Sequence, residues 1–390
     1  MHVALTPEQS ALREEIAAYF RRLVTPELAE ALREHGATPT YKEVIRRMGR
    51  DGTLAVGWPK EHGGRGLGPV EQLIFVREAL RAGAPIPFVT LSTVGPTLMA
   101  HGTAEQKARY LPGIAEGRIH FAIGYSEPSS GTDLASLRTR AVPDGNGFRV
   151  NGSKIYTSHV EGADHIWLAV RTDPDAPKHK GISILVVDRD AAGVSHTPIE
   201  TVAGMRTNAT YYEDVWVPGD ALVGPLNGGW NLITSQLNHE RIGIAARGVH
   251  GEALYDRTLA WAEEPDAGGR RPIEDPTIRR LLALVHARLD TLRVMNYRLA
   301  WMAATGQADI AFGSAAKAHG VDVLLETCRD LLQVVGPGGL VRHGSAAARL
   351  QGDLEMHYRL HQNATFGGGS AEVMREIVAQ RGLGLPRTVR

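Results

Sequence analysis

The spacing of apolar and polar residues changes twice along the chain, and up to about residue 116 it predicts helices. Residues 6–9 read TPEQ, a capping box with Thr6 as the N-cap, Pro7 at the first helical position and Gln9 three residues after the cap. TAEQ at residues 103–106 repeats this device. Between them, WPKEHGGRGLGP at residues 58–69 is rich in glycine and proline and predicts a connection.

Between about residue 117 and residue 225 the pattern predicts strands. HFAIGYS, GFRVNGSKIYTS, DHIWLAVRT and GISILVVD are short segments rich in β-branched and aromatic residues. DGNG at residues 144–147 is a hairpin turn signal within this zone. TYYEDVWVPGDALVG predicts a further strand, which is closed by Pro218 and Gly219.

From about residue 226 the pattern is helical again. LLALVHARLDTLRVMNYRLAWMAA and AAKAHGVDVLLETCRDLLQVVG both space their apolar residues by three and four. We therefore predict an α+β fold with an N-terminal helical domain (1–116), a middle β-barrel or sandwich-like domain (117–225) and a C-terminal helical bundle (226–390). No GxGxxG follows a strand and no GxxxxGK(S/T) occurs, so the sequence gives no support for a Rossmann unit or a phosphate loop.

The composition argues against several classes of protein but does not identify one. Lysine plus arginine and aspartate plus glutamate both number 43, so there is no global electrostatic case for nucleic acid or an anionic membrane. Cys328 is the only cysteine, which excludes an internal disulfide and a cysteine metal cluster. We expect no metal site, and a reducing cytoplasm is the simplest location. The first residues lack a secretory signal, and no run approaches the roughly 18 apolar residues of a membrane helix.

One predicted helix carries an acid on its apolar stripe. In GWNLITSQLNHERIGIAARG, residues 229–248, Trp230, Ile233, Leu237 and Ile244 fall on one face, together with Glu240. Burial raises the pKa of a carboxyl group unless a cation or hydrogen-bond donors compensate, and such tuning suits a general base. The alternative is a structural ion pair with Arg241 or Arg247, because ion pairs also perturb pKa values.

Two further segments concentrate hydroxyl groups. GYSEPSSGTDLASLRT at residues 124–139 follows a predicted strand, and such a loop can offer hydroxyls and backbone N–H groups to a polar ligand. GSKIYTS at residues 152–158 predicts a strand that brings Tyr156, Thr157 and Ser158 to one place. On composition alone, an ordinary Ser/Gly turn is the favoured interpretation of the first segment. The second segment is a weaker signal still, because strands often carry Tyr and Thr.

A run of three glycines precedes the last predicted helix. Residues 365–370 read TFGGGS, and Ser370 is a plausible N-cap for AEVMREIVAQRG. Glycine allows the backbone to turn freely and to approach another group closely. The stretch carries no catalytic side chain of its own.

These segments, in this order, resemble the acyl-CoA dehydrogenase family over essentially the whole chain. YSEPSSGTD is similar to the family's S/T-E-P-x-A/S-G-S/T-D signature, and GSKIYTS to its G-x-K-x-W/Y-I/T-S/T strand. LLQVVGPGG is similar to the Q-x-x-G-x-x-G segment, and FGGGSAEVMREIVA to the C-terminal signature. The helix–sheet–helix order agrees with the family.

The resemblance implies FAD as cofactor, an acyl-CoA thioester as substrate and a trans-2-enoyl-CoA as product, with electron-transfer flavoprotein as acceptor. A base removes the α-proton while the β-hydrogen leaves as hydride to the flavin. Donors aimed at the thioester oxygen stabilise the developing enolate. In the family one donor is a backbone N–H of the C-terminal loop, here from Gly368 or close by, and another is a flavin ribityl hydroxyl.

The resemblance also assigns flavin contacts residue by residue. The contacts on the flavin of the same chain are Tyr125, Ser126, Thr132, Tyr156, Thr157, Ser158, Ser370 and Glu372. Gln333 and Gly336 match positions that reach the flavin of a neighbouring subunit.

Two departures from the family pattern are informative. Many members carry a glutamate base in the C-terminal loop, at the position that matches Gly368, and this chain has none there. In one branch the base comes from the long helix, at the position of Glu240. The missing acid and the acid on an apolar stripe together favour Glu240 as base, with Arg241 positioning or polarising it. Glu372 is then an acid favoured by the helix dipole.

The second departure concerns assembly. The family usually has an R-x-x-F-G motif after the long helix, whereas here AEEPDAGGRRPIEDPTIRR offers Arg270 and Arg271 without an aromatic–glycine pair. Actinobacterial members that act on CoA thioesters of sterol side chains show the same departures, and NHER, KHKGISIL and TFGGG resemble them. Those enzymes are α2β2 heterotetramers of two related chains. The resemblance implies that this chain is the one supplying the base.

Two other readings remain open at this point. The chain could be a homo-oligomeric dehydrogenase of short or branched acyl-CoA, or a non-catalytic partner subunit in which the acid is structural. A flavin monooxygenase of the same fold is a further option, which oxygen uptake would reveal.

Overall fold

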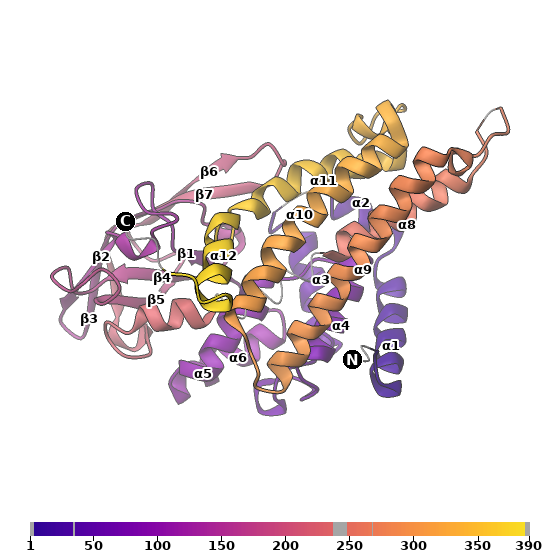
Figure 1. Cartoon of the computed structure of the whole chain (residues 1–390). Helices are drawn as coiled ribbons and strands as arrows, with labels where there is room; N and C mark the ends of the chain where they lie inside the picture. Colours follow the sequence, from indigo (N-terminus) through magenta and orange to yellow (C-terminus); the bar gives the residue numbers. More distant parts are fainter. Residues whose placement is uncertain (1–3, 34–35, 237–247, 267, 387–390) are drawn as a thin grey trace. The chain divides into compact units, whose positions relative to one another are not determined.

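The structure is a computed structural model, and it describes the chain except for residues 1–3, 34–35, 237–247, 267 and 387–390 (Figure 1). By their contacts the residues group into two compact units. Unit 1 comprises Met1–Ala17, Val76–Ala82 and Arg241–Arg390. Unit 2 comprises Ala18–Phe75 and Gly83–Glu240. Helices α1 (Pro7–Leu23) and α4 (Pro69–Arg81) contribute residues to both.

Further helices of unit 2 precede the sheet in the chain, and all but one of them begin at a threonine N-cap. They are α2 (Pro26–Ala31), α3 (Pro39–Arg50), α5 (Gly95–His101) and α6 (Ala104–Ala115). Thr103 and Gln106 complete both hydrogen bonds of the predicted capping box at α6. Thr6 and Gln9 do the same at α1, at 3.1 and 3.2 Å. Both capping predictions are confirmed.

An eight-stranded mixed sheet forms the rest of unit 2. Its strands are β1 (Phe121–Gly124), β2 (Arg140–Asp144), β3 (Gly147–Lys154), β4 (His165–Arg171), β5 (Ile182–Asp188), β6 (Val194–Glu200), β7 (Arg206–Pro218) and β8 (Leu222–Val223). Their order is β6-β7-β3-β2-β4-β5-β8, with β1 paired in parallel to β4. The DGNG turn joins β2 to β3 as an antiparallel hairpin, as predicted.

The sheet consists of two halves joined at one point. β2 and β4 are paired only through Arg140 and Arg171, whereas the pairs on either side run over several residues. One core lies between the halves, because Val150 of β3 and Val215 of β7 belong to the same buried cluster as Leu168 of β4. This arrangement is sandwich-like, with an apolar interior that alternating strand residues supply.

Three strand predictions need correction. β3 ends at Lys154, so residues 155–158 follow the strand instead of continuing it. β7 begins at Arg206, several residues earlier than predicted. β6 was missed, because its residues are mostly polar or half-exposed and Pro198 stands inside it, features that suit only an edge strand.

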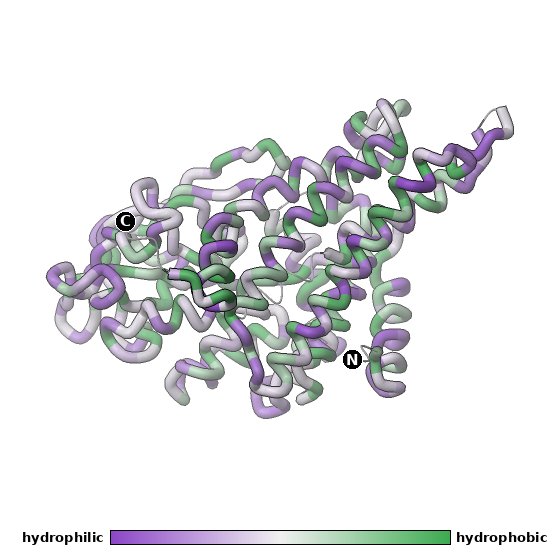
Figure 2. The backbone as a smooth tube through the Cα atoms, viewed as in Figure 1, coloured by the Kyte–Doolittle hydropathy of each residue, from purple (hydrophilic) through white to green (hydrophobic). Residues whose placement is uncertain are grey.

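Unit 1 is dominated by three helices: α8 (Gly248–Glu263), α9 (Pro276–Ala304) and α10 (Ile310–Val335). α9 and α10 lie side by side, and apolar and polar segments alternate along both (Figures 1 and 2). Asp275 and Asp309 cap their N-termini. Shorter helices follow, α11 (Asp353–His361) and α12 (Ala371–Ile377). Cys328 lies in the core that α8, α9 and α10 share.

The predicted fold class is confirmed: helices precede a β-sheet, and a helical bundle follows it. In the described part of the chain, no helix is both long and apolar enough to cross a membrane.

Candidate active site

The two hydroxyl-rich segments predicted to contact the cofactor lie together in unit 2. The backbone N–H of Ile155 donates a hydrogen bond to the carbonyl oxygen of Ser126 at 2.8 Å. The Lys154 ammonium donates to the carbonyl oxygen of Tyr125 at 3.1 Å. The structure thus joins segments that stand about thirty positions apart in the chain, since |i−j| is 29 for Lys154 and Tyr125.

A buried ion pair holds this junction. The Lys154 Nζ lies 2.8 Å from Oε1 of Glu127, and the two side chains are 0% and 5% exposed. Glu127 also accepts hydrogen bonds from the backbone N–H groups of Arg138 and Thr139, at 2.7 and 2.8 Å. The signature glutamate and the signature lysine are therefore structural partners, which the sequence analysis did not foresee.

Both members of the pair are ionised near neutral pH. Burial alone would raise the pKa of Glu127, but the Lys154 charge and the hydrogen bonds lower that pKa overall. Complete burial lowers the pKa of Lys154 to about 8, against the opposing effect of the Glu127 charge. A paired and fully hydrogen-bonded arrangement of this kind is how a protein tolerates charge in its interior.

Tyr125 belongs to a second buried network. Its hydroxyl donates to Oε1 of Gln236. The indole Nε1 of Trp167, on β4, lies 3.1 Å from both the Tyr125 hydroxyl and Gln236 Oε1. Gln236 itself is fully buried, and its position in residues 229–236 ties the start of the predicted base helix to the signature loop.

Arg171 fixes the remainder of the signature loop. Its guanidinium donates to the carbonyl oxygens of Ala135 at 2.6 Å and Lys180 at 2.9 Å. At the surface, Lys178 pairs with Asp133 at 2.8 Å. Thr132 lies beside that surface pair and is exposed, whereas Ser126 is half-buried. Arg171 thereby fixes the part of the loop that contains the short 3-10 helix Leu134–Ser136.

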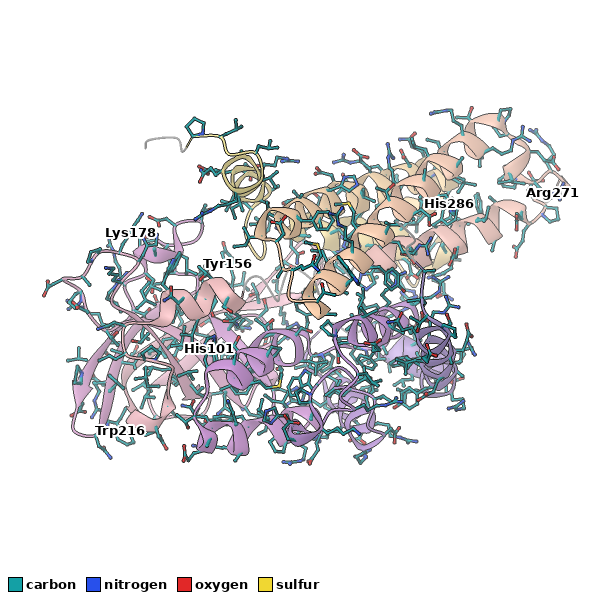
Figure 3. The ribbon with its side chains drawn as sticks, turned by 60° about the horizontal axis from the view of Figure 1, so that its bottom comes forward. His101, Tyr156, Lys178, Trp216, Arg271 and His286 are labelled. Carbon is teal, nitrogen blue, oxygen red and sulfur yellow. The ribbon has the colours of Figure 1, made fainter. Side chains whose placement is uncertain are left out.

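Tyr156 has an unusual backbone conformation. Its φ is 62°, in the left-handed region that bulky residues rarely adopt, and its side chain is 63% exposed (Figure 3). Thr157 turns inward, where its hydroxyl lies 3.1 Å from that of Thr210 on β7. Ser158 lies 3.0 Å from Thr207 in the same way. Strain of this kind is held where surrounding structure requires it, and it gathers at ligand sites.

Two buried polar atoms of this site lack a hydrogen-bond partner among the described residues. The Nε2 of Gln236 is one, and it lies next to the Tyr125 network. The Oδ1 of Asn208 is the other, while its Nδ2 donates to the carbonyl oxygen of Thr157 at 3.2 Å. A ligand with both donors and acceptors would satisfy them, and a flavin ring has both along its edge. This region of unit 2 therefore fits the cofactor that the resemblance implies.

The glycine stretch lies in unit 1. Gly368 and Gly369 have φ values of 67° and 96°, conformations that favour glycine, so the run of glycines is required by the turn. Ser370 is the N-cap of α12 and accepts a hydrogen bond from the N–H of Val373 at 3.3 Å, as predicted. Phe366, just before the stretch, is 66% exposed.

Glu372 occupies the first turn of α12. The backbone N–H of the helix start and then the Ser370 hydroxyl lower its pKa, so its carboxylate form is favoured. A base with a lowered pKa is a weaker proton acceptor. This environment supports the prediction that Glu372 is a dipole-favoured acid and not the base.

A buried lysine binds the backbone of the glycine stretch. Lys317, on α10, is 1% exposed, and its Nζ donates a hydrogen bond to the carbonyl oxygen of Gly369. A lysine in the middle of an apolar helix was not singled out from the sequence. The signal was present, because AAKAHG places one charge inside a small-residue stretch.

The residues expected to face a neighbouring subunit lie at element ends of unit 1. Gln333 is exposed in the last turn of α10, and Gly336 ends that helix with a φ of 73°. Arg271 lies in the connection between α8 and α9 and pairs with Glu274 at 3.0 Å (Figure 3). The backbone N–H of Arg270 donates to Asp266 at 3.0 Å.

The predicted base lies outside the described residues, as do Arg241 and Arg247. The described part of the helix predicted to carry the base ends at Gln236. Within it, Ile233 is fully buried, and the ring of Trp230 packs edge-on against that of His179, with the ring centroids 4.8 Å apart. The apolar stripe is thus confirmed for its first turns.

Family comparison covers the chain almost throughout. The acyl-CoA dehydrogenase N-terminal domain matches residues 6–118, the middle domain residues 122–215 and the C-terminal domain residues 227–383. The chain belongs to the acyl-CoA dehydrogenase family. The resemblance inferred from the four signatures is therefore confirmed, and the chain is placed among oxidoreductases.

The relatives point to one branch of this family. The chain is 47% identical to acyl-CoA dehydrogenase FadE26 of Mycobacterium tuberculosis, over 100% of both chains. A solved structure described as the Tcur3481-Tcur3483 steroid ACAD is similar with a TM-score of 0.94 and 48% identity, covering 100% of each chain. The ChsE4-ChsE5 complex from Mycobacterium tuberculosis is similar with a TM-score of 0.93 and 47% identity, again over 100% of each chain.

Proposed function

We propose that this chain supplies the catalytic base of an FAD-dependent acyl-CoA dehydrogenase, which converts an acyl-CoA thioester to a trans-2-enoyl-CoA. The observation that carries the proposal is the glycine stretch of unit 1. It has the backbone geometry to approach a ligand, it contains no acid, and the first carboxylate after it in the chain, Glu372, lies at a helix start that lowers its pKa. The base must then come from elsewhere in the chain, and Glu240 is the acid that the sequence pattern and the family branch both favour.

FAD, when bound, supplies the acceptor for the hydride that leaves the β-carbon. The chain's own part is to hold the cofactor, orient the thioester and take the α-proton. We assign cofactor contacts in unit 2 to Tyr125, Ser126, Thr132, Tyr156, Thr157 and Ser158. In unit 1 we assign them to Ser370 and Glu372. The two unpartnered polar atoms of Gln236 and Asn208 support the unit 2 assignment.

Proton removal needs a polarised thioester. The α-proton is weakly acidic until donors stabilise the negative charge that develops on the thioester oxygen. We assign one donor to the backbone N–H of Gly368 or its neighbour, in a turn that Lys317 holds in place through Gly369. The proton then passes to the Glu240 carboxylate while the α,β double bond forms, and Arg241 positions that carboxylate.

The finer parts of the proposal rest on the relatives. Since one solved relative is described as a steroid ACAD, we propose a bulky, sterol-derived acyl group as substrate. Since another is described as a complex of two named chains, we propose a related dehydrogenase chain as partner, in an α2β2 assembly. Gln333 and Gly336 are the residues that we assign to the subunit boundary. Electron-transfer flavoprotein is the proposed acceptor.

The deciding experiment compares two carboxylates. Glu240→Gln and the matched control Glu372→Gln are each co-expressed with the related chain, and flavin bleaching by a sterol acyl-CoA is followed anaerobically. We expect Glu240→Gln to retain flavin and to bleach about 10²–10⁴-fold more slowly, whereas Glu372→Gln keeps most of the rate. Full activity of Glu240→Gln would falsify the base assignment and leave a non-catalytic subunit as the better reading.

A substrate panel separates the two enzymatic readings. Straight-chain, branched and sterol side-chain CoA thioesters are compared by kcat/KM, on the chain alone and on the co-expressed assembly. An active yellow protein formed by the chain alone, with a preference for short acyl-CoA, would replace the heterotetramer by a homo-oligomer.

A further inference from the structure

Three histidines converge in unit 1. His250 lies on α8, near its start. His357 and His361 lie on α11, four residues apart, so they project from one face of that helix. Each offers an imidazole nitrogen, and these three ligand atoms all lie within 4.8 Å of one another.

The rings are packed as a compact triad. The ring centroids of His250 and His357 are 5.1 Å apart, those of His250 and His361 are 5.7 Å apart, and those of His357 and His361 are 5.4 Å apart. His361 is 3% exposed, and the other two are half-buried. The Nδ1 atoms of His250 and His357 and the Nε2 atom of His361 are shielded from solvent.

The seam between α8 and α11 is fixed independently of the histidines. Arg257, two turns beyond His250 on α8, forms an ion pair with Asp353, one turn before His357 on α11. A second guanidinium nitrogen of Arg257 donates to the carbonyl oxygen of Leu350 at 3.1 Å. The two helices therefore run in opposite directions along this seam, with the ion pair at one end and the three imidazoles at the other.

The charged residues beside the triad are engaged with their own partners. Glu252, two residues after His250, pairs with Arg77 at 2.7 Å. Glu355 and Arg359 pair with each other along α11 at 2.7 Å. Among the described residues, the metal-ligating groups that converge at this end of the seam are the three imidazoles.

Three neutral imidazoles are a ligand set for a borderline divalent metal. Zinc binds histidine nitrogen at about 2.0–2.1 Å and is tetrahedral, so its nitrogen ligands lie about 3.3 Å apart. Small rotations of the rings would bring atoms that now lie within 4.8 Å to that spacing. Imidazole also suits copper, nickel and cobalt, whereas magnesium and calcium require oxygen ligands.

We propose that His250, His357 and His361 form a binding site for a divalent metal ion of the zinc class, which ties α8 to α11. No metal site was predicted from the sequence: the lone cysteine excludes a cysteine cluster, and His250 lies more than a hundred positions before the other two histidines. Three protein ligands leave one tetrahedral position for water. The site is independent of the proposed dehydrogenation, since none of its ligands is assigned to FAD or to the thioester.

The experiment measures metal on the assembled protein. The full chain, with any co-purifying partner, is stripped with chelator and then titrated with Zn²⁺ against a chromophoric competitor. His250→Gln, His357→Gln and His361→Gln are compared with His286→Gln. That control removes an exposed imidazole that packs against Tyr255 on the surface of the same unit (Figure 3).

We expect one zinc ion per chain in the wild type and in His286→Gln, with a raised Tm, and affinity weakened about tenfold or more in each triad variant. Co²⁺ should give the visible absorption of a tetrahedral site in the first two proteins only. His250→Gln replaces a ring that is only half-buried, so this variant can test zinc binding if His361→Gln fails to fold. Equal zinc binding by the triad variants and the wild type would overturn the proposal, as would no retained zinc in the folded wild type.

Discussion

The ammonium group of Lys317 donates a hydrogen bond to the carbonyl oxygen of Gly369, from a position on α10 that is 1% exposed. The glycine stretch is thus not a free loop, although it carries no side chain that could anchor it. A buried cation fixes the carbonyl of Gly369, the residue that follows Gly368, to which the N–H donor for the thioester is assigned. The geometry of the C-terminal loop therefore depends on a residue more than fifty positions earlier, since |i−j| is 52.

Lys317→Met should loosen this stretch. The Gly369 carbonyl oxygen then loses the hydrogen bond from the Lys317 ammonium, which should lower the free energy of unfolding by about 1–3 kcal/mol. We also expect kcat to fall while flavin content is kept. Urea unfolding and steady-state kinetics measure the two effects. The control is Arg375→Met on α12, which breaks an exposed pair with Asp322 of α10 and should change stability by less than about 1 kcal/mol. Equal effects of both substitutions would contradict this role of Lys317.

Lys154→Met should be among the most damaging single substitutions in unit 2. It leaves the Glu127 carboxylate buried without its cation, which costs about 3–5 kcal/mol. Adding Glu127→Gln to Lys154→Met removes the uncompensated charge and keeps an acceptor for one of the two N–H groups, those of Arg138 and Thr139, that Glu127 binds. The double variant should therefore be more stable than Lys154→Met alone in urea unfolding. If it is less stable, the two side chains do not act as a pair.

The same pair predicts how stability depends on pH in the acid range. The pKa of Glu127 is lower in the folded chain than its ordinary value of 4.5, so the folded state binds this proton less readily than the unfolded state. Its contribution is fully present above about pH 4.5 and is lost as pH falls through the folded pKa. Urea unfolding between pH 6 and pH 3 should show a steeper loss in the wild type than in Glu127→Gln with Lys154→Met. Parallel curves would exclude this group as a source of acid sensitivity.

Tyr156→Gly should separate stability from cofactor binding. Glycine adopts the left-handed conformation without the cost of about 1–2 kcal/mol that other residues bear. The free energy of unfolding of the protein without FAD should therefore stay level or rise. FAD content after gel filtration should fall, because the exposed ring assigned to the cofactor is lost. A variant with unchanged FAD content would remove Tyr156 from the site, whatever its stability.

Sequence patterns foresaw the elements whose residues repeat regularly. The spacing of apolar residues placed α9 and α10, and the caps at Thr6, Thr103 and Ser370 were all confirmed. These features depend on neighbours within one or two turns. β6 and the end of β3 were missed, because pairing with β7 decides the first and the backbone turn at Tyr156 decides the second.

The sequence predicted which residues to consider for the candidate site. It did not predict the contacts that hold those residues in place. Signature segments identified the family and the hydroxyl-bearing residues of both units. The supports come from contacts between distant positions: Lys154 with Glu127, Gln236 with Tyr125 and Trp167, and Lys317 with Gly369. A charge or amide inside an apolar stretch was the available signal in each case. The partner of each group becomes known only when the chain is folded.

The lone thiol of Cys328 is an intrinsic probe of how often the helical core of unit 1 opens. Enclosed among the helices of unit 1, it has a pKa raised by burial to about 12, so almost no reactive thiolate exists at neutral pH. With a single cysteine in the chain, any adduct formed by an alkylating reagent reports on this one position. The rate of adduct formation then measures how often the helical core exposes its centre, without a label, a mutation or a bound ligand.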